Sequence, residues 1–268
     1  MIKRLGLLCM GLLLSWAAQA QCEAVNTAFK AGERLTYDLY FNWKFVWVKA
    51  GTAEMKITDT TYHRIPSYRT YLQTKGNKKA DFFFVMRDTL TSIVSHDLVP
   101  YYFRKGAEEG KHYTVDEVRY SYSNGTSHLK QVRYKRGREP RHSEQTEHRC
   151  VYDMLSILSR ARSFDASDYT IGQKILFPMA TGTSVEQQTL IYRGKEVIEA
   201  NDKHHYRCLK LSFVEYKKGK EKEVITFFVS DDQNHLPIRL DMYLNFGSAK
   251  AFLTGIHGNR HPIGARVK

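Results

Sequence analysis

The sequence predicts a mainly β protein, an antiparallel curved sheet that forms an open half-barrel or a sandwich, with one central α-helix. Aromatic residues make up 13% of the chain, and they favour the pleated, half-buried surfaces of strands. Runs of alternating apolar and polar residues recur through most of the chain, bounded by turn-forming residues. Only one long segment has helical spacing. Strand runs joined by short turns are typical of antiparallel meanders.

The N-terminal segment 1–20 has the features of a signal peptide. Lys3 and Arg4 precede an apolar run, and Ala18 and Ala20 place small residues where signal peptidase reads them. We expect cleavage after Ala20, which leaves 21–268 as a single β-rich domain. No later run is long and apolar enough to predict a transmembrane segment.

The first β-rich half is expected over about 29–140. Apolar and polar residues alternate in Leu35–Phe41 and again in Ala53–Ile57, which predicts a strand and a return strand. Asn124-Gly125 separates two further strand-like runs. These two residues suit a two-residue hairpin turn, so this is the strongest hairpin signal in the chain.

The central helix is expected over 150–163. Its apolar residues fall on one face at helical spacing. They are Val151, Met154, Leu155, Leu158 and Ala161. Asp153 near the start and Arg160 near the end match the helix dipole, which explains them without a catalytic role. A second β-rich half is expected over about 170–257, although no residue-by-residue repeat relates the two halves.

Removal of the signal peptide leaves three cysteines, Cys22, Cys150 and Cys208. Cys208 lies in an alternating run and is best explained as a buried apolar residue. The sequence therefore favours a Cys22–Cys150 disulfide in an oxidising compartment. The alternatives are a free thiol or a lipid-modified Cys22, although Gln19 and Gln21 fit a lipoprotein signal poorly.

The chain is strongly basic, and loss of Lys3 and Arg4 lowers its formal net charge from +13 to +11. Such a balance favours acidic partners, including lipid head groups or another anionic amphiphile. The charge is spread over several turn regions, which also fits solvated loops. Export and the lack of a stripe of stacked aromatic and arginine residues argue against nucleic acid.

No motif in the sequence predicts catalysis, a cofactor or a metal site. His204 and His205 are adjacent on a predicted strand and so point to opposite faces. The chain has no HExxH, no CxxC in the mature part and no GxSxG motif. We therefore expect a protein that is not an enzyme. A glycan hydrolase with scattered carboxylates is a weaker alternative.

Aromatic residues near the N-terminus are the best candidates for ligand binding. The expected ligand-binding residues are Tyr37, Trp43, Phe45, Trp47 and Phe83. On a concave apolar surface they would hold an acyl chain or a sugar ring. Alternatively, they fill a core or cover a sheet.

Several motifs resemble an exported family of unknown function from Gram-negative bacteria. The motifs are Phe29–Tyr37 with Ala50–Ala53, Tyr152–Arg162, Asp232–Arg239 and Gly247–Leu253. The resemblance implies an exported β-rich protein without established activity or catalytic residues. Its architecture is similar, by analogy, to the LolA/LolB half-barrel carriers, which hold acyl groups on a curved sheet. Fold alone does not fix function.

Together these features predict a periplasmic or outer-membrane-associated binding protein that holds a lipid or another amphiphile. A structural or protein-interaction component of the envelope, without a small ligand, is the alternative function.

Overall fold

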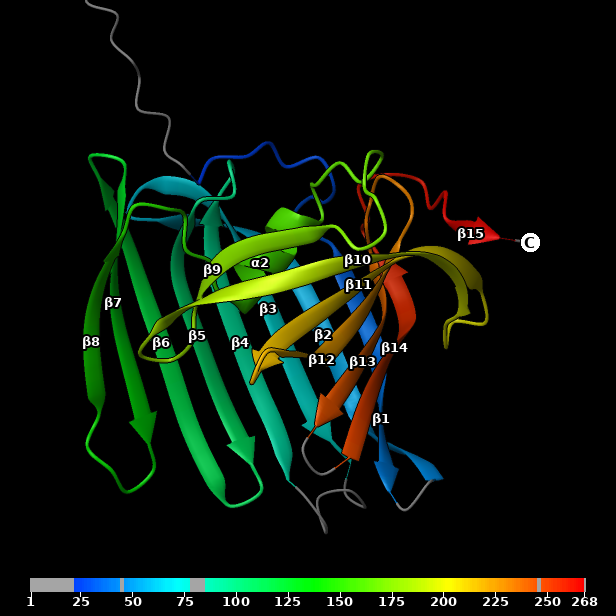
Figure 1. Cartoon of the computed structure of the whole chain (residues 1–268), viewed down its shortest axis with the longest axis horizontal. Coiled ribbons are helices and arrows are strands. Elements are labelled where there is room, and N and C mark those ends of the chain that lie inside the picture. Colours follow the sequence, from blue (N-terminus) through cyan, green and yellow to red (C-terminus); the bar gives the residue numbers. More distant parts are fainter. Residues whose placement is uncertain (1–21, 44–45, 78–84, 245–246, 268) are drawn as a thin grey trace, which may run out of the picture.

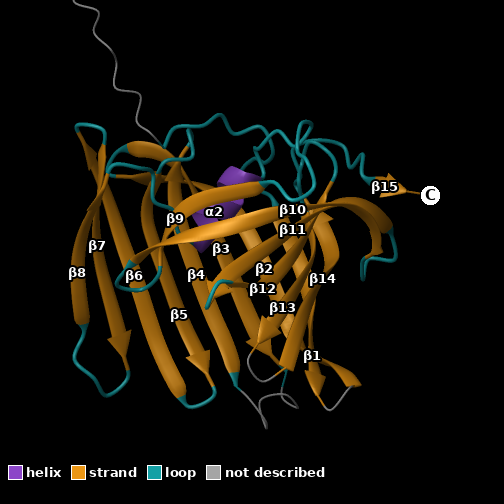
Figure 2. Ribbon diagram, in the orientation of Figure 1, coloured by secondary structure: helices purple, strands orange, loops and turns teal. Residues whose placement is uncertain are grey.

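The alternating segments of the sequence form the strands of one antiparallel sheet, and a short helix lies on its concave side (Figures 1 and 2). The structure is a computed structural model, and it describes residues 22–43, 46–77, 85–244 and 247–267. The strands before the helix are β1 (Arg34–Trp43), β2 (Val46–Tyr62), β3 (Ile65–Gly76), β4 (Met86–Ser95), β5 (Pro100–Glu109), β6 (His112–Ser123), β7 (Thr126–Lys135) and β8 (Arg141–Glu147). The strands after it are β9 (Lys174–Ala180), β10 (Val185–Glu199), β11 (His205–Lys217), β12 (Lys220–Ser230), β13 (Pro237–Leu244), β14 (Gly247–His257) and β15 (Arg266–Val267).

The two halves of the chain join in the middle of the sheet. The strand order is β8-β7-β6-β5-β4-β3-β2-β1-β14-β13-β12-β11-β10-β9, and β15 pairs with β11. Strand β1 therefore pairs with β2 on one side and with β14 on the other. The described strands β8 and β9 form the two edges, so the sheet curves without closing into a barrel. The predicted fold class is confirmed.

The β6–β7 hairpin shows how local sequence fixes the register. Asn124 and Gly125 have φ values of 49° and 69°, the left-handed conformation that a two-residue hairpin turn requires. Ser123 pairs directly with Thr126, so the turn contains only these two residues. The hairpin predicted from Asn124-Gly125 is confirmed.

Helix α2 (Met154–Ala161) begins later and ends earlier than the range of 150–163 expected from sequence. It lies between the long sheet of β3–β7 and the strands β9–β11 that cross in front of it (Figure 1). Leu155 packs with side chains of β4–β7, whereas Ile157 packs with Phe177 and Leu190 of β9 and β10. The helix is thus enclosed on several sides and fills part of the concave space.

This enclosure changes which helix positions are buried. Met154 was expected in the apolar face but is 44% exposed. Ser156 and Ser159 are buried. Their hydroxyl groups keep hydrogen-bond partners there, because the Ser159 hydroxyl donates to Leu155 O at 3.0 Å and Ser156 Oγ accepts from the Asp153 amide at 2.8 Å. A single apolar stripe is therefore a poor description of a helix that sheet strands surround.

Candidate functional site

The concave face beyond α2 changes from apolar to charged along one row of paired residues. Directly opposed residues of antiparallel strands share a face. The row runs through Leu72, Leu90, Lys105, Asp116 and Arg133, one residue from each of β3–β7. We call Lys105, Asp116 and Arg133 the charged row. The register places it on the same face as the apolar residues that contact the helix.

A hollow of about 250 Å³ lies over the charged row. Its lining includes Lys105 and Glu109 of β5, Asp116 of β6, and Arg133 and Lys135 of β7. Opposite charges therefore alternate around the hollow, which makes it suitable for a polar or charged group of a ligand.

Arg133 is held rigidly in this hollow. Its Nε donates to Asp116 Oδ1 at 2.6 Å and its Nη2 donates to Asp116 Oδ2 at 2.9 Å, a two-pronged pair that also raises the pKa of Arg133. The β9–β10 turn lies against the same side chain. At Gly182, where φ is +81°, a Cβ atom would lie 1.8 Å from Arg133 Nη2. Only glycine fits this approach.

Asp88 of β4 adds a carboxyl group with an unusual proton affinity. Its pKa is raised to about 6, mainly because the carboxyl group is buried. The positive charge of Lys105 acts against this rise, and the negative charge of Glu109 adds to it. Within the described part of the chain, Asp88 Oδ1 is a buried acceptor without a hydrogen-bond donor. Such an atom can accept a hydrogen bond from a hydroxyl or amine of a ligand.

The opposite wall of the concave face is apolar. Its half-buried side chains lie in two rows of paired residues on β11, β12 and β13. These rows are Leu211, Phe227 and Leu240, and Phe213, Ile225 and Met242. We call these six residues the apolar wall. Half-buried apolar side chains on a curved face can cover the hydrocarbon part of a ligand.

Two of the predicted aromatic residues, Tyr37 and Trp47, lie apart from this wall. Tyr37 is only 6% exposed, and its hydroxyl donates to Pro237 O at 2.9 Å, while burial raises its pKa. Trp47 pairs with Asn42, whereas Val48 pairs with Phe41 on the concave side, so Trp47 lies on the convex face. The side chain of Trp43, and residues Phe45 and Phe83, lie outside the part of the chain described.

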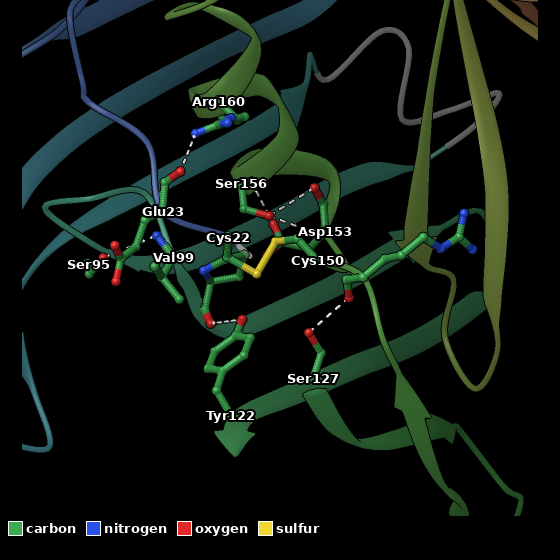
Figure 3. Close-up of a disulfide and its surroundings, with 12 residues drawn as sticks. Cys22, Glu23, Ser95, Val99, Tyr122, Ser127, Cys150, Asp153, Ser156 and Arg160 are labelled. Atoms are coloured by element: carbon green, nitrogen blue, oxygen red, sulfur yellow. Dashed lines mark hydrogen bonds between the residues drawn. A yellow bond between two sulfur atoms is a disulfide. The ribbon is translucent and has the colours of Figure 1, made fainter. Parts of the chain in front are cut away.

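The predicted disulfide between Cys22 and Cys150 is present (Figure 3). Cys208 is a buried free thiol. The bond ties the first described residue, Cys22, to the segment before α2. Next to it, Tyr152 forms a bridge with Met179 of β9. These links fix the entry of the helix into the concave space.

Asp153 and Arg160 have structural partners at the two ends of the helix. Asp153 is fully buried, and its carboxylate accepts from Leu155 N and Ser156 N at 2.9 Å and from Ser92 Oγ at 3.1 Å. Burial outweighs these bonds and raises its pKa to about 6. Arg160 Nη1 donates to Glu23 O at 3.1 Å. This cap explains Asp153 through helix geometry.

No group of three or more His, Cys, Asp or Glu residues among the described residues could hold a metal ion. No helix in the described ranges is long and apolar enough to cross a bilayer.

One solved structure shares the fold of this chain. A crystal structure of a β-barrel-like protein of the family DUF1849 from Brucella abortus has a TM-score of 0.55 and 12% identity, and the match covers 86% of this chain and 99% of that one. At this identity the likeness shows the fold alone. A Bacteroides fragilis protein with a YmcC-like fold has a TM-score of 0.36 and 8% identity, over 87% of this chain and 99% of that one. No curated protein matches the chain. The family model DUF3108, described as a protein of unknown function, matches residues 36–254, and the chain belongs to this family.

Proposed function

We propose that the protein is an exported binding protein of the cell envelope that holds a lipid or another amphiphile on its concave face and performs no chemistry. One observation carries this proposal. The apolar wall and the charged row lie on the same curved face, with a hollow of about 250 Å³ over the charges. A molecule with an apolar chain and a polar head matches this division.

The apolar wall would supply most of the affinity. Each methylene group removed from water contributes about 0.8 kcal/mol, and a micromolar complex requires about 8 kcal/mol. About ten methylenes of an acyl chain would therefore supply that amount, before the cost of immobilising the ligand is subtracted. The six half-buried side chains of the wall are already ordered by the sheet, which keeps that cost low.

The charged row would orient the head group rather than drive binding. The Arg133 guanidinium is already paired with Asp116, and Lys105 Nζ lies 3.6 Å from Glu109 Oε1. Since these charges are largely balanced within the protein, a ligand gains more in orientation than in net attraction. Asp88 Oδ1 offers an acceptor for a hydroxyl or amine on the same head group.

The signal-peptide features and the Cys22–Cys150 bond support an oxidising, extracytoplasmic location. We infer a periplasmic or outer-membrane-associated protein for this reason. The net positive charge of the chain is also compatible with anionic lipid head groups.

Native mass spectrometry of the mature protein purified from its own host tests the proposal. A bound lipid that is released on unfolding is the expected result. Reproducible absence of any such mass, together with a stable protein partner in the same preparation, would overturn lipid binding and favour the alternative, an interaction protein of the envelope.

A further inference from the structure

The free ends of two neighbouring hairpins carry a cluster of exposed apolar side chains. Val46, Trp47 and Val48 begin β2, and Tyr243 and Leu244 end β13; each is between 40% and 61% exposed. We call these five residues the tip patch. Large apolar side chains gathered in one place on a surface mark a site of interaction.

Both parts of the tip patch lie at the same end of the sheet. Strands β2, β1, β14 and β13 are consecutive. Val46 pairs with Trp43 at the end of the β1–β2 hairpin, and Leu244 pairs with Gly247 at the end of the β13–β14 hairpin. Figure 1 shows these ends pointing away from α2 and from both described chain ends.

The tip patch is apolar on both faces of the sheet. Successive residues of a strand point to opposite faces, so Val46 and Val48 share one face while Trp47 lies on the other. Tyr243 and Leu244 divide in the same way. A sheet with one face in water alternates apolar and polar residues, as most of β1 does. Loss of that alternation at the two hairpin ends indicates a medium that is apolar on both sides.

The chemistry around the tip patch favours a lipid bilayer. Tyr and Trp have apolar rings with a polar edge, which suits the boundary between acyl chains and head groups. Lys49 and Lys250 both pair with Tyr40, one row behind the tips, and Lys250 Nζ lies 4.6 Å from the centre of the Trp47 ring. Asp38 and Asp241 lie close to these two ammonium groups. The attraction to anionic lipid therefore also draws on the formal net charge of the chain, which is +13 and falls to +11 without Lys3 and Arg4.

We propose that the tip patch inserts shallowly into an anionic bilayer, so that the two hairpin ends dock the protein on a membrane surface. The apolar tips would enter the acyl boundary, and the row of Lys49 and Lys250 would lie at the level of the phosphates. This docking does not depend on whether the concave face holds a lipid.

Sedimentation of the mature protein with vesicles tests the docking. We expect binding to vesicles of phosphatidylcholine mixed with phosphatidylglycerol, and weaker binding to phosphatidylcholine alone. The double variant Val46→Ser/Leu244→Ser should bind the mixed vesicles at least about tenfold more weakly, since burial of either side chain contributes about that factor.

The matched control is Leu176→Ser/Val197→Ser, which removes two aliphatic side chains of similar or greater exposure from β9 and β10. It should bind like the wild type. In a Trp43→Phe variant, Trp47 is the one tryptophan left after signal cleavage, and its fluorescence should shift to shorter wavelength with the mixed vesicles. Equal loss in both double variants, or no vesicle binding and no shift, would overturn the proposal. Specific capture of a protein through the tip patch without vesicle binding would identify a protein interface instead.

Discussion

Arg162, at the C-terminal end of α2, forms an ion pair with Glu33, just before β1, that is almost completely shielded from water. Their side chains are 2% and 0% exposed, and Arg162 Nη1 lies 2.5 Å from Glu33 Oε1. Arg162 also donates to Asn234 O through Nε at 3.1 Å and through Nη2 at 3.0 Å. Its guanidinium lies 5.3 Å from the centre of the Phe29 ring. One side chain thus connects the helix, the start of β1 and the turn before β13.

Replacement of Arg162 by methionine should destabilise the fold by about 3–5 kcal/mol, because it leaves the Glu33 carboxylate buried without its partner. Urea unfolding of the mature protein measures this loss. Arg160→Met is the matched control, since Arg160 is only partly buried and bonds to a backbone carbonyl; it should cost about 1 kcal/mol or less. Equal losses for the two variants would contradict a special role for the ion pair.

The strands, the Asn124-Gly125 turn and the Cys22–Cys150 pair could be anticipated because their signals are local or depend on simple counting. Glu33 and Arg162 could not be paired in this way, since they lie 129 residues apart. The charged row shows the same limit. Lys105, Asp116 and Arg133 meet because of the register between β5, β6 and β7, and each alone resembles an ordinary charged strand residue.

Tyr37 and Trp47 illustrate what alternation alone leaves open. The pattern of β1 correctly separates its two faces, but it does not indicate which face is covered by the rest of the fold. Tyr37 is buried and bonds to Pro237 at the start of β13, whereas Trp47 lies on the convex face. The apolar wall had a visible signal in the alternation of Leu209–Phe213, but its meaning required knowledge of the curvature.

Tyr37→Phe should lower stability without weakening ligand binding. The variant leaves the buried Pro237 carbonyl without the Tyr37 hydroxyl, at a cost of about 1–2 kcal/mol. Thermal unfolding measures the stability, and displacement of a fluorescent fatty acid measures the binding. If the variant bound the fatty acid more weakly than the wild type at a temperature where both are equally folded, Tyr37 would belong to the ligand site after all.

Thiol titration of the mature protein should give a stepwise count. The native protein should show no reactive thiol, because Cys208 is buried and burial raises its pKa to about 12. Unfolding without a reductant should expose one thiol, and reduction should expose three. A Cys22→Ser variant should lose about 2–5 kcal/mol of stability. Three thiols in the unfolded, unreduced protein would contradict the bond.

Asp88→Asn should stabilise the protein above neutral pH and have little effect in acid. Burial raises the pKa of Asp88 from 3.8 to about 6, so the folded state holds its proton to a higher pH than the unfolded state does. The stability from this protonation is fully present below pH 3.8 and is lost as the pH rises past about 6. Asparagine stays neutral throughout. The melting temperature of the variant should exceed that of the wild type by a few degrees at about pH 8 and match it at about pH 4.

The carboxylate of Glu199 provides the control for this pH dependence, since it is exposed at the end of β10. The gain in melting temperature over the wild type between about pH 4 and about pH 8 should be larger for Asp88→Asn than for Glu199→Gln. An Asp88→Asn variant that is less stable than the wild type at about pH 8, with a difference that vanishes at about pH 4, would show that Lys105 stabilises Asp88 as the anion, contrary to the dominance of burial.

Met242→Gln should weaken the binding of an amphiphile while preserving the fold. Glutamine has nearly the shape of methionine, but its amide would lie against an acyl chain on the apolar wall. An amide without a hydrogen-bond partner in such a place costs about 1–3 kcal/mol, which corresponds to a loss of about tenfold to a hundredfold in affinity. Since Met242 is only half-buried, water can solvate the amide when the site is empty. The free protein should therefore keep its unfolding temperature. Displacement of a fluorescent fatty acid measures the affinity, with Leu176→Gln as the control on an exposed side chain. If both variants bound the probe like the wild type while a convex-face change weakened it, the ligand would lie on the other side of the sheet.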